Sequence, residues 1–307
     1  MRKLYLAGTG NVSRNLLKLI AKFNSDIQII GIENSRGQLC SEEGLNMTEI
    51  NKFMSAPEDF RKSESIRKLD FDVYVDMRTA SRNGERERDD YIDLMKNGKH
   101  IVTANKSGLA NFFPEIGRAS MENHKKLYFE ATVAGGLPIF SLLRSSFPSF
   151  TVNSFTGVVN LTSNFVMKKV NGGMSLKEAK RKATEEGVAE TDMTDDLDGT
   201  DSARKAVILA NSLFNMPLRL KELSYSGINP DNIKMNEMLL AKLSMDGEFT
   251  VESRVFKLEN EDPFLRLAPM GMACTIGFAE RNPVYISEDM DGPLETAGAV
   301  FSDILSV

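Results

Sequence analysis

The chain has 307 residues, of which 41% are hydrophobic and 26% are charged. These fractions are close to the globular average and exclude a mainly disordered, collagenous or coiled-coil chain. The net charge of −5 argues against a protein that binds nucleic acid mainly through phosphate contacts. Two cysteines and two histidines are too few for a disulfide framework and count against zinc-hydrolase chemistry. Because free thiols fit a reducing compartment and no run reaches the roughly 18 apolar residues of a membrane span, we expect a cytoplasmic protein that binds neither nucleic acid nor membrane.

In the first third of the chain, short apolar runs alternate with helical patterns. A buried strand over 4–7 is followed by a helix from Val12, in which apolar residues recur at helical spacing. Residues 34–66 are polar, with one short helix. The later elements expected here are strands over 27–32, 71–75, 101–104 and 127–131 and a helix over 89–96. Since strands that alternate with helices pair in parallel through right-handed crossovers, the pattern predicts an α/β fold with a Rossmann-type parallel sheet.

The middle of the chain lacks this regular alternation. The elements expected there are a strand and then a helix over 154–167, helices over 176–186 and 202–214, and strands over 223–227 and 249–258. This order predicts an inserted α+β domain over 131–292. A last helix over 296–305 is expected to return to the first domain, which would comprise 1–130 and 293–307.

A glycine turn follows the first strand. In Gly8-Thr9-Gly10, the first glycine permits a tight turn, and the second lets the backbone approach a pyrophosphate at the helix N-terminus. Ser13, in the third position of the motif, is small enough to keep the helix close to the strand. The pattern predicts a cofactor-binding turn that continues into Asn11 and Val12, whereas the alternative is a glycine turn without a ligand.

The choice of cofactor stays open between NAD and NADP, with a slight preference for NAD. Glu33 lies 23 residues after Gly10, where a carboxylate binds the ribose 2′-hydroxyl of NAD. Arg36 could instead pair with the 2′-phosphate of NADP. Both are also ordinary residues for a charged surface loop.

Thr103-Ala104-Asn105-Lys106 follows the fourth strand. Ligands of open α/β sheets gather at the carboxyl ends of the strands. Lys106 can therefore hold an anionic or hydroxyl-bearing substrate, and Thr103 is a candidate cofactor contact. The alternative is a solvated loop lysine.

The segment 187–205 is dense in carboxylates. A calcium loop would start at Thr194 and end at Lys205, where acidic ligands are needed, so this reading fails. The acids could simply cap a helix, at Asp198 or Asp201.

A second reading of the same segment is chemical. Asp201 and Lys205 lie four residues apart, on one helix face. The carboxylate could orient a lysine that exchanges a proton with a substrate hydroxyl. Burial or a second lysine, for which Lys106 is the candidate, would lower the pKa of Lys205.

Several motifs, in this order and spacing, resemble the homoserine dehydrogenase family in its short form without a kinase or regulatory domain. The resemblance covers nearly the whole chain. The matching residues are Gly8–Val12, His100–Lys106, Glu130–Pro138, Gly157–Asn160, Ala189-Glu190-x-Asp192, Asp196-x-x-Gly199-x-Asp201, Lys205, Thr296–Gly298 and Asp303–Leu305.

The resemblance implies an NAD(P)-dependent interconversion of L-homoserine and L-aspartate 4-semialdehyde, in threonine and methionine biosynthesis. It implies that Lys205 is the proton donor and acceptor, that Asp201 orients it, and that Lys106 contacts substrate and cofactor. It also implies that Glu190, helped by Asp196, binds the amino group of the substrate.

The resemblance further implies that the second domain binds substrate and forms a homodimer, for which the methionine-rich segment 235–245 would suit buried packing. It implies a sodium-type site in a turn whose alternative role is to pack the domain junction. The carbonyls that would bind the ion belong to Glu130, Val133, Gly135 and Leu137.

Three departures from the family pattern bear on the cofactor. Glu288-Asp289-Met290-Asp291-Gly292 replaces Gly-x-Gly-Ala-Gly, so only Gly292 remains as a cofactor contact and three carboxylates would repel a phosphate. Arg78 stands where Thr or Ser is usual, and its guanidinium could reach a phosphate. Leu161-Thr162-Ser163 replaces Gly-Thr-Thr. These changes keep two alternatives open: a non-catalytic NAD(P)-binding regulatory homologue, and a dehydrogenase for another amino-acid-derived alcohol or aldehyde.

Overall fold

The computed structural model describes residues 1–23, 26–61, 65–189, 191–229 and 233–307. It divides into two compact units, Met1–Gly135 with Pro293–Val307, and Gly136–Gly292. The first unit continues past residue 130 because the 3-10 turn Glu130–Thr132 is tied to the last helix. The backbone N–H of Glu130 donates to Asp303 Oδ2 at 2.8 Å.

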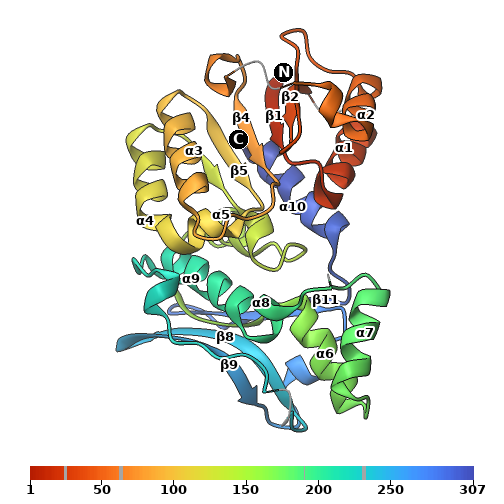
Figure 1. Ribbon diagram of the computed structural model, residues 1–307. Coiled ribbons are helices and arrows are strands. Elements are labelled where there is room, and N and C mark those ends of the chain that lie inside the picture. The colour runs from red at the N-terminus through yellow and green to blue at the C-terminus, as the bar shows by residue number, and fades with distance from the viewer. Residues whose placement is uncertain (24–25, 62–64, 190, 230–232) are drawn as a thin grey trace. The chain divides into compact units, whose positions relative to one another are not determined.

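The first unit is built around a six-stranded sheet in the order β3-β2-β1-β4-β5-β6 (Figure 1). Neighbouring strands are parallel, except that β3 runs antiparallel to β2. The elements are β1 (Arg2–Ala7), α1 (Asn11–Phe23), β2 (Ile27–Glu33), β3 (Gln38–Cys40), α2 (Met47–Ser55), β4 (Val73–Asp76), α3 (Glu85–Lys96), β5 (His100–Thr103), α4 (Lys106–Glu122), β6 (Leu127–Tyr128) and α10 (Pro293–Ser306). The predicted Rossmann-type parallel sheet is confirmed.

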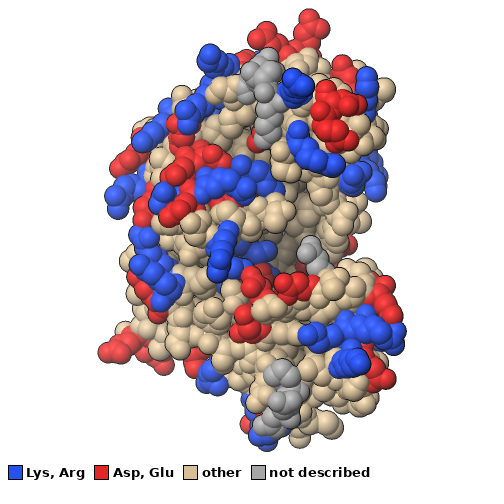
Figure 2. All heavy atoms as spheres, viewed as in Figure 1, with Lys and Arg blue, Asp and Glu red and all other residues tan. Residues whose placement is uncertain are grey.

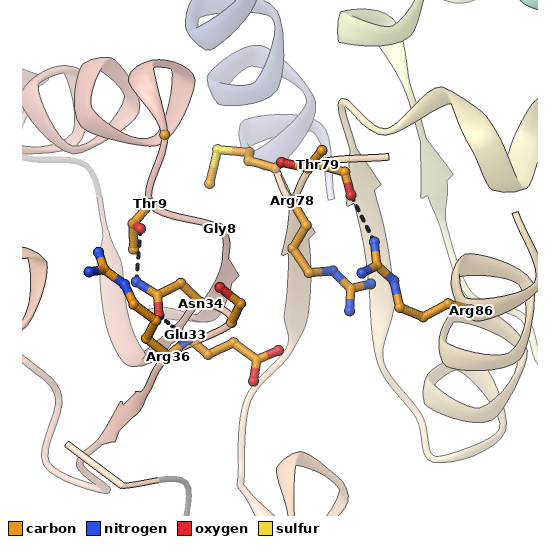
Figure 3. A pocket seen from close by; sticks show the side chains of 11 residues that line it. Gly8, Thr9, Glu33, Asn34, Arg36, Arg78, Thr79 and Arg86 are labelled. Atoms are coloured by element: carbon orange, nitrogen blue, oxygen red, sulfur yellow. Dashed lines mark hydrogen bonds between the residues drawn. The ribbon is translucent and has the colours of Figure 1, made fainter. Parts of the chain in front are cut away.

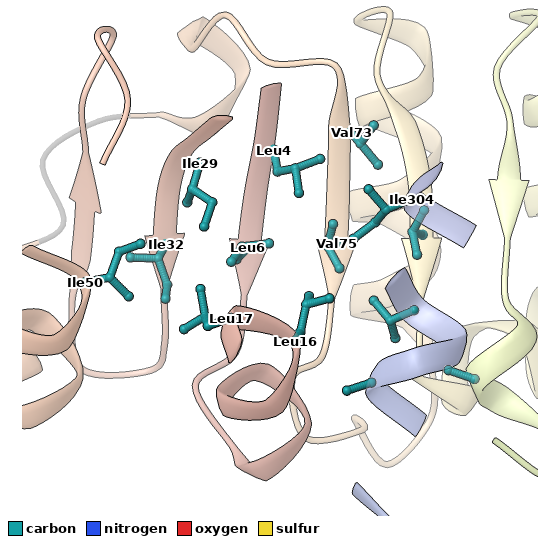
Figure 4. Packing of buried hydrophobic residues seen from close by; sticks show 14 of the residues in the cluster. Leu4, Leu6, Leu16, Leu17, Ile29, Ile32, Ile50, Val73, Val75 and Ile304 are labelled. Atoms are coloured by element: carbon teal, nitrogen blue, oxygen red, sulfur yellow. The ribbon is translucent and has the colours of Figure 1, made fainter. Parts of the chain in front are cut away.

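The core of the first unit lies between the sheet and helices α1 and α10 (Figure 4). Its buried side chains include Leu4, Leu6, Leu16, Leu17, Val73, Val75 and Ile304. Helix α10 buries Ala297, Val300 and Ile304, which recur at helical spacing on one face. This apolar face is why the last helix of the chain returns to the first unit, as the sequence predicted.

The second unit contains a five-stranded sheet in the order β11-β10-β7-β8-β9, antiparallel throughout. Helix α9 packs against β7, β8 and β9. The elements are α5 (Ile139–Ser146), β7 (Val152–Val158), α6 (Leu161–Asn171), α7 (Leu176–Glu185), α8 (Thr194–Leu197), α9 (Thr200–Phe214), β8 (Glu237–Asp246), β9 (Glu248–Lys257), β10 (Met272–Phe278) and β11 (Val284–Glu288). The predicted α+β character of this part of the chain is confirmed.

Several local predictions were wrong. The segment 223–227 forms no strand, because only Tyr225 makes an isolated bridge, to Ser253. The strand expected over 127–131 ends at Tyr128, where the chain turns. Helix α4 was not expected, because Gly108 and Pro114 interrupt the helical pattern, and the helix is kinked near them.

The methionine-rich segment 235–245 is buried only in part within the single chain. It lies mostly in β8, where successive side chains alternate between the faces of the sheet. Met238 is buried within the single chain, whereas Met235 and Met245 are exposed on it. Among the helices that the described residues form, none has both the length and the apolar content to cross a bilayer.

Candidate active site

A cavity of about 450 Å³ opens at the carboxyl ends of β1, β2 and β4 in the first unit (Figure 3). Its walls combine the glycine turn, the loop after β2, the loop after β4 and the first turn of α3. The lining residues are Gly8, Thr9, Gly10, Glu33, Asn34, Ser35, Arg36, Met77, Arg78, Thr79 and Arg86. This is the edge of an open α/β sheet at which ligands bind.

The two glycines of the turn have different roles. Gly8 has φ +104° and lies under the loop after β4, where a Cβ would come within 2.5 Å of the Met77 carbonyl oxygen. Gly10 has open space on its Cβ side, where no atom of the described residues other than its chain neighbours lies within 4 Å. Ser13 is fully buried, as expected for a helix close to its strand. Gly8 therefore serves the fold, and Gly10 leaves room for a ligand.

This difference gives a paired prediction. Gly8→Ala should destabilise the protein by about 2 to 3 kcal/mol, because the methyl group meets Met77 in a strained backbone conformation. Gly10→Ala should leave the free energy of unfolding within about 0.5 kcal/mol of the wild type but weaken NAD(P) binding at least about tenfold. Urea unfolding and calorimetric titration of the cofactor measure the two effects. Equal loss of stability in both variants would contradict this division of roles.

The loop after β2 brings Glu33 and Arg36 to the cavity (Figure 3). Asn34 fixes the loop, since its amide donates to Thr9 Oγ1 at 3.0 Å and its oxygen accepts the Arg36 N–H at 2.8 Å. Arg36 is exposed, and its guanidinium lies 3.5 Å from Glu58. Both candidate ribose contacts therefore line the cavity, and the choice between NAD and NADP remains open. Asn11 and Val12 begin α1 beside the cavity without lining it.

Arg78 also lines the cavity, but its guanidinium is already engaged. It makes two hydrogen bonds to Asp76, at 2.9 and 3.0 Å, and an ion pair with Asp90 at 2.9 Å. Arg78 therefore lies at the cavity already paired with two carboxylates, and its contact with a cofactor phosphate stays a prediction.

Thr103 belongs to a buried polar network rather than to the cavity wall. Its hydroxyl lies 2.7 Å from the Tyr91 hydroxyl and accepts the Asn105 N–H at 2.9 Å. Tyr91 in turn donates to Asp76 at 2.8 Å. The Thr103 side chain is thus held in the interior, and the contact of Thr103 with the cofactor stays a prediction.

Glu87 joins the same network to the start of α4. It is fully buried and accepts hydrogen bonds from Asn105 at 3.0 Å and from Arg86 at 2.6 Å, as well as from Ser81. Burial raises the pKa of Glu87, but the hydrogen bonds from Ser81 and Arg86 outweigh it and hold that pKa below its usual value. Asn105 caps α4 by accepting the Ser107 N–H, and Lys106 follows as the first residue of the helix.

In the second unit, the spacing of Asp201 and Lys205 on α9 gives the expected ion pair. Lys205 Nζ lies 2.7 Å from Asp201 Oδ2 and donates to the Val159 carbonyl at 2.5 Å. Both residues are only 9% exposed. A buried lysine with two fixed partners is held in one position, as proton transfer to a bound substrate requires.

Asn160, which sequence reasoning did not name as a site residue, joins the carboxylates of this site. Its amide nitrogen donates to Asp196 Oδ1 at 2.7 Å and to Asp201 Oδ2 at 2.8 Å. Burial raises the pKa of Asp196, and the charge of Asp201 raises it further, against the hydrogen bond from Asn160. The sequence signals for Asn160 were its place in the Gly157–Asn160 family match and an Asn at the start of a helix.

A glycine sets the approach of Asp196 to Asp201. Gly199, with φ +87°, is the N-cap residue of α9, and it turns the chain from α8 into α9. The expectation that Asp198 or Asp201 is the N-cap is therefore wrong, although Asp198 does accept the Thr200 N–H at 2.8 Å. Figure 2 shows acidic side chains gathered over α8.

The remaining predicted site residues are less informative. Glu190 lies outside the described residues. Gly292 ends the second unit, four residues after Glu288, which ends β11 and packs its carboxylate against Gly136. Among the predicted sodium ligands, the Leu137 carbonyl accepts the Ile139 N–H at 2.9 Å, and Glu130, Val133 and Gly135 belong to the first unit. The roles of Glu190 and Gly292 and the sodium site stay predictions.

Comparison with known proteins identifies the family. Residues 138–305 match the family model of homoserine dehydrogenase, and residues 8–130 match that of the homoserine dehydrogenase NAD binding domain. The chain is 30% identical to the homoserine dehydrogenase of Sulfurisphaera tokodaii over 308 residues, which cover 99% of this chain and 97% of that protein.

Solved structures agree with this match. The crystal structure of homoserine dehydrogenase from Thermoplasma acidophilum has a TM-score of 0.90 and 35% identity, covering 99% of this chain and 98% of that one. A hyperthermophilic archaeal homoserine dehydrogenase mutant in complex with NADPH shares the fold, with a TM-score of 0.84 at 24% identity over 99% of this chain and 97% of that one. The chain therefore belongs to the homoserine dehydrogenase family of oxidoreductases, and its first unit contains the NAD-binding domain of that family.

Proposed function

We propose that this protein interconverts L-homoserine and L-aspartate 4-semialdehyde with NAD or NADP, a step towards threonine and methionine. The observation that carries the proposal is the buried Lys205, held by Asp201 and the Val159 carbonyl beside Asp196. Membership of the family supplies the substrate class.

Lys205 is the proton donor and acceptor. An ammonium group has three N–H donors, and Asp201 and Val159 take two of them. We assign the third to the substrate oxygen. In the reduction, Lys205 donates its proton to the carbonyl oxygen while positive charge stabilises the developing alkoxide. In the oxidation, the neutral amine accepts the proton of the hydroxyl group.

The amino group of the substrate needs a carboxylate partner. We propose Asp196 together with Glu190, as the family resemblance implies. Asp196 is half-buried and hydrogen-bonded to Asn160, so a single orientation of its carboxylate is favoured.

The cavity of the first unit suits a dinucleotide. Gly10 leaves open space beside the start of α1, where a pyrophosphate can approach the helix N-terminus. A dinucleotide held there would supply or accept the hydride in the reaction. Glu33 and Arg36 are the proposed ribose contacts, and Lys106, positioned by the Asn105 cap, is a proposed contact to substrate and cofactor.

The purified protein is expected to form NADH or NADPH in proportion to added homoserine. The absorbance of the reduced nicotinamide measures this, with each cofactor in turn. A panel of other amino-acid-derived alcohols is the specificity control. Cofactor binding by calorimetry without turnover of homoserine at any pH would support a regulatory homologue instead, and turnover of a different alcohol alone would replace the substrate.

We also propose that the protein is a cytoplasmic homodimer and that sodium binds the carbonyls of the Glu130–Leu137 turn. Neither Cys40 nor Cys274 is part of a disulfide in the described structure, which suits a reducing compartment. Exposed Met235 and Met245 offer apolar contacts to a second copy. Light scattering after gel filtration tests the dimer, and exchange of sodium for a bulky organic cation in the assay tests the ion.

A further inference from the structure

We infer that Asn160 is a positioning residue that joins the carboxylate proposed to bind the substrate, Asp196, to the Asp201–Lys205 pair proposed to move the proton. The inference rests on the proposed function for the roles of these partners. The juxtaposition itself is geometric. One amide nitrogen lies 2.7 Å from Asp196 Oδ1 and 2.8 Å from Asp201 Oδ2.

The orientation of the Asn160 amide is fixed by its third contact. Asn160 is the N-cap residue of α6, and its Oδ1 accepts the backbone N–H of Ser163 at 2.7 Å. A backbone N–H can only donate, so the amide oxygen must face the helix and the NH₂ group must face the carboxylates. Asn160 is 3% exposed, which leaves the amide little freedom to turn away.

The Asn160 amide therefore does more than cap a helix. Asp201 Oδ2 receives both the Asn160 amide and the Lys205 ammonium, so the position of Lys205 is linked to that of Asp196 through a single side chain. Two neighbouring carboxylates repel each other, and a shared NH₂ group offsets this repulsion.

Several neighbouring groups affect the pKa of Asp196. The charges of Asp201 and Lys205 face it from α9, and the Thr162 hydroxyl bonds to it from α6. On its own helix, the neighbouring Asp195 is paired with Arg204. The Asn160 amide lowers the pKa of Asp196 against the effect of burial. Loss of the amide should therefore leave Asp196 protonated up to a higher pH.

Two substitutions separate the cap from the amide donors. Asn160→Ser keeps a good N-cap residue but loses the reach to both carboxylates. Asn160→Asp keeps the shape and the acceptor for Ser163, but replaces the NH₂ group by an oxygen that faces Asp196 and Asp201. Both variants should fold, and both should lose about 10- to 100-fold in kcat/KM for homoserine, as expected for losing hydrogen bonds to charged groups. The acidic limb of the pH profile should move up by about one pH unit.

The matched control is Asn46→Ser, at the N-cap of α2. Asn46 accepts the N–H groups of Thr48 and Glu49 and does not line the cavity proposed for the cofactor. This variant should keep both the kcat/KM and the pH profile of the wild type. Values of kcat/KM within twofold of the wild type, or an unmoved acidic limb, in both Asn160 variants would overturn the inference.

A second measurement does not depend on turnover. The ¹³C signal of the Asp196 carboxyl, assigned with Asp196→Asn, reports its titration in the wild type and in Asn160→Ser. We expect a higher midpoint in the variant. An unchanged midpoint overturns the inference, whether or not the wild type oxidises homoserine. If the wild type is inactive but the midpoint is raised in the variant, the inference stands and only the proposed function is contradicted.

Discussion

Lys205→Met is expected to lower kcat for homoserine oxidation by about 100- to 10,000-fold, the range found when a positioned acid–base group is removed. Methionine fills the same buried volume but carries no proton. The amide of Asn160 still donates to Asp201 in this variant, so that carboxylate keeps one hydrogen bond. Stopped-flow or steady-state absorbance of the reduced nicotinamide measures the loss.

Arg204→Ala is the matched control for Lys205→Met. Arg204 is the preceding residue of α9, and its side chain pairs with the exposed Asp195 rather than with the proposed site. The kcat of Arg204→Ala should match that of the wild type. If the single variant at Lys205 fails to fold, the double variant Lys205→Met with Asp201→Asn removes both charges of the pair and restores balance in the interior. A folded variant that retains more than a tenth of wild-type kcat would remove Lys205 as the proton donor.

Glu87→Ala is expected to destabilise the protein by about 2 to 3 kcal/mol, because it removes the buried acceptor of a hydrogen-bond network. Glu87 is fully buried in the first unit, where Asn105 and Arg86 donate to it. After truncation, the Asn105 amide is left in the interior without its acceptor. Urea unfolding at neutral pH measures the change.

The control for Glu87→Ala is Glu85→Ala, at the exposed start of the same helix, where a loss below about 1 kcal/mol is expected. Equal losses in the two variants would contradict the role of Glu87. Because Asn105 caps the helix that begins with Lys106, Glu87→Ala should also raise the KM of any protein that remains folded.

The lowered pKa of Glu87 adds a pH dependence. Its folded-state pKa lies below its usual value, so the folded state binds fewer protons at this group than the unfolded state does. The stabilisation is therefore complete above the usual value of 4.5 and is lost as the pH falls through the lowered pKa. Relative to Glu87→Gln, which cannot titrate, the wild type should lose stability on acidification to about pH 4 and below. If the free energies of unfolding of the two proteins changed equally with pH across this range, the prediction would be contradicted.

The sequence by itself determined the features that depend on local order along the chain. The strand, glycine turn and helix over residues 2–23 follow from apolar spacing and from the freedom of glycine at Gly8. The pairing of Asp201 with Lys205 follows from the four-residue repeat of a helix. The family motifs, read in order, gave the family that the comparisons then established.

Only the tertiary structure decided which distant groups share a site. Asn160 reaches Asp196 and Asp201 across 36 and 41 residues of sequence, and no periodicity relates these positions. Likewise, only folding places Arg78 against both Asp76 and Asp90. In both cases folding removes several polar groups from water together. Each buried charge then needs a partner among the side chains that the fold brings near it, and the sequence does not show which side chains these are.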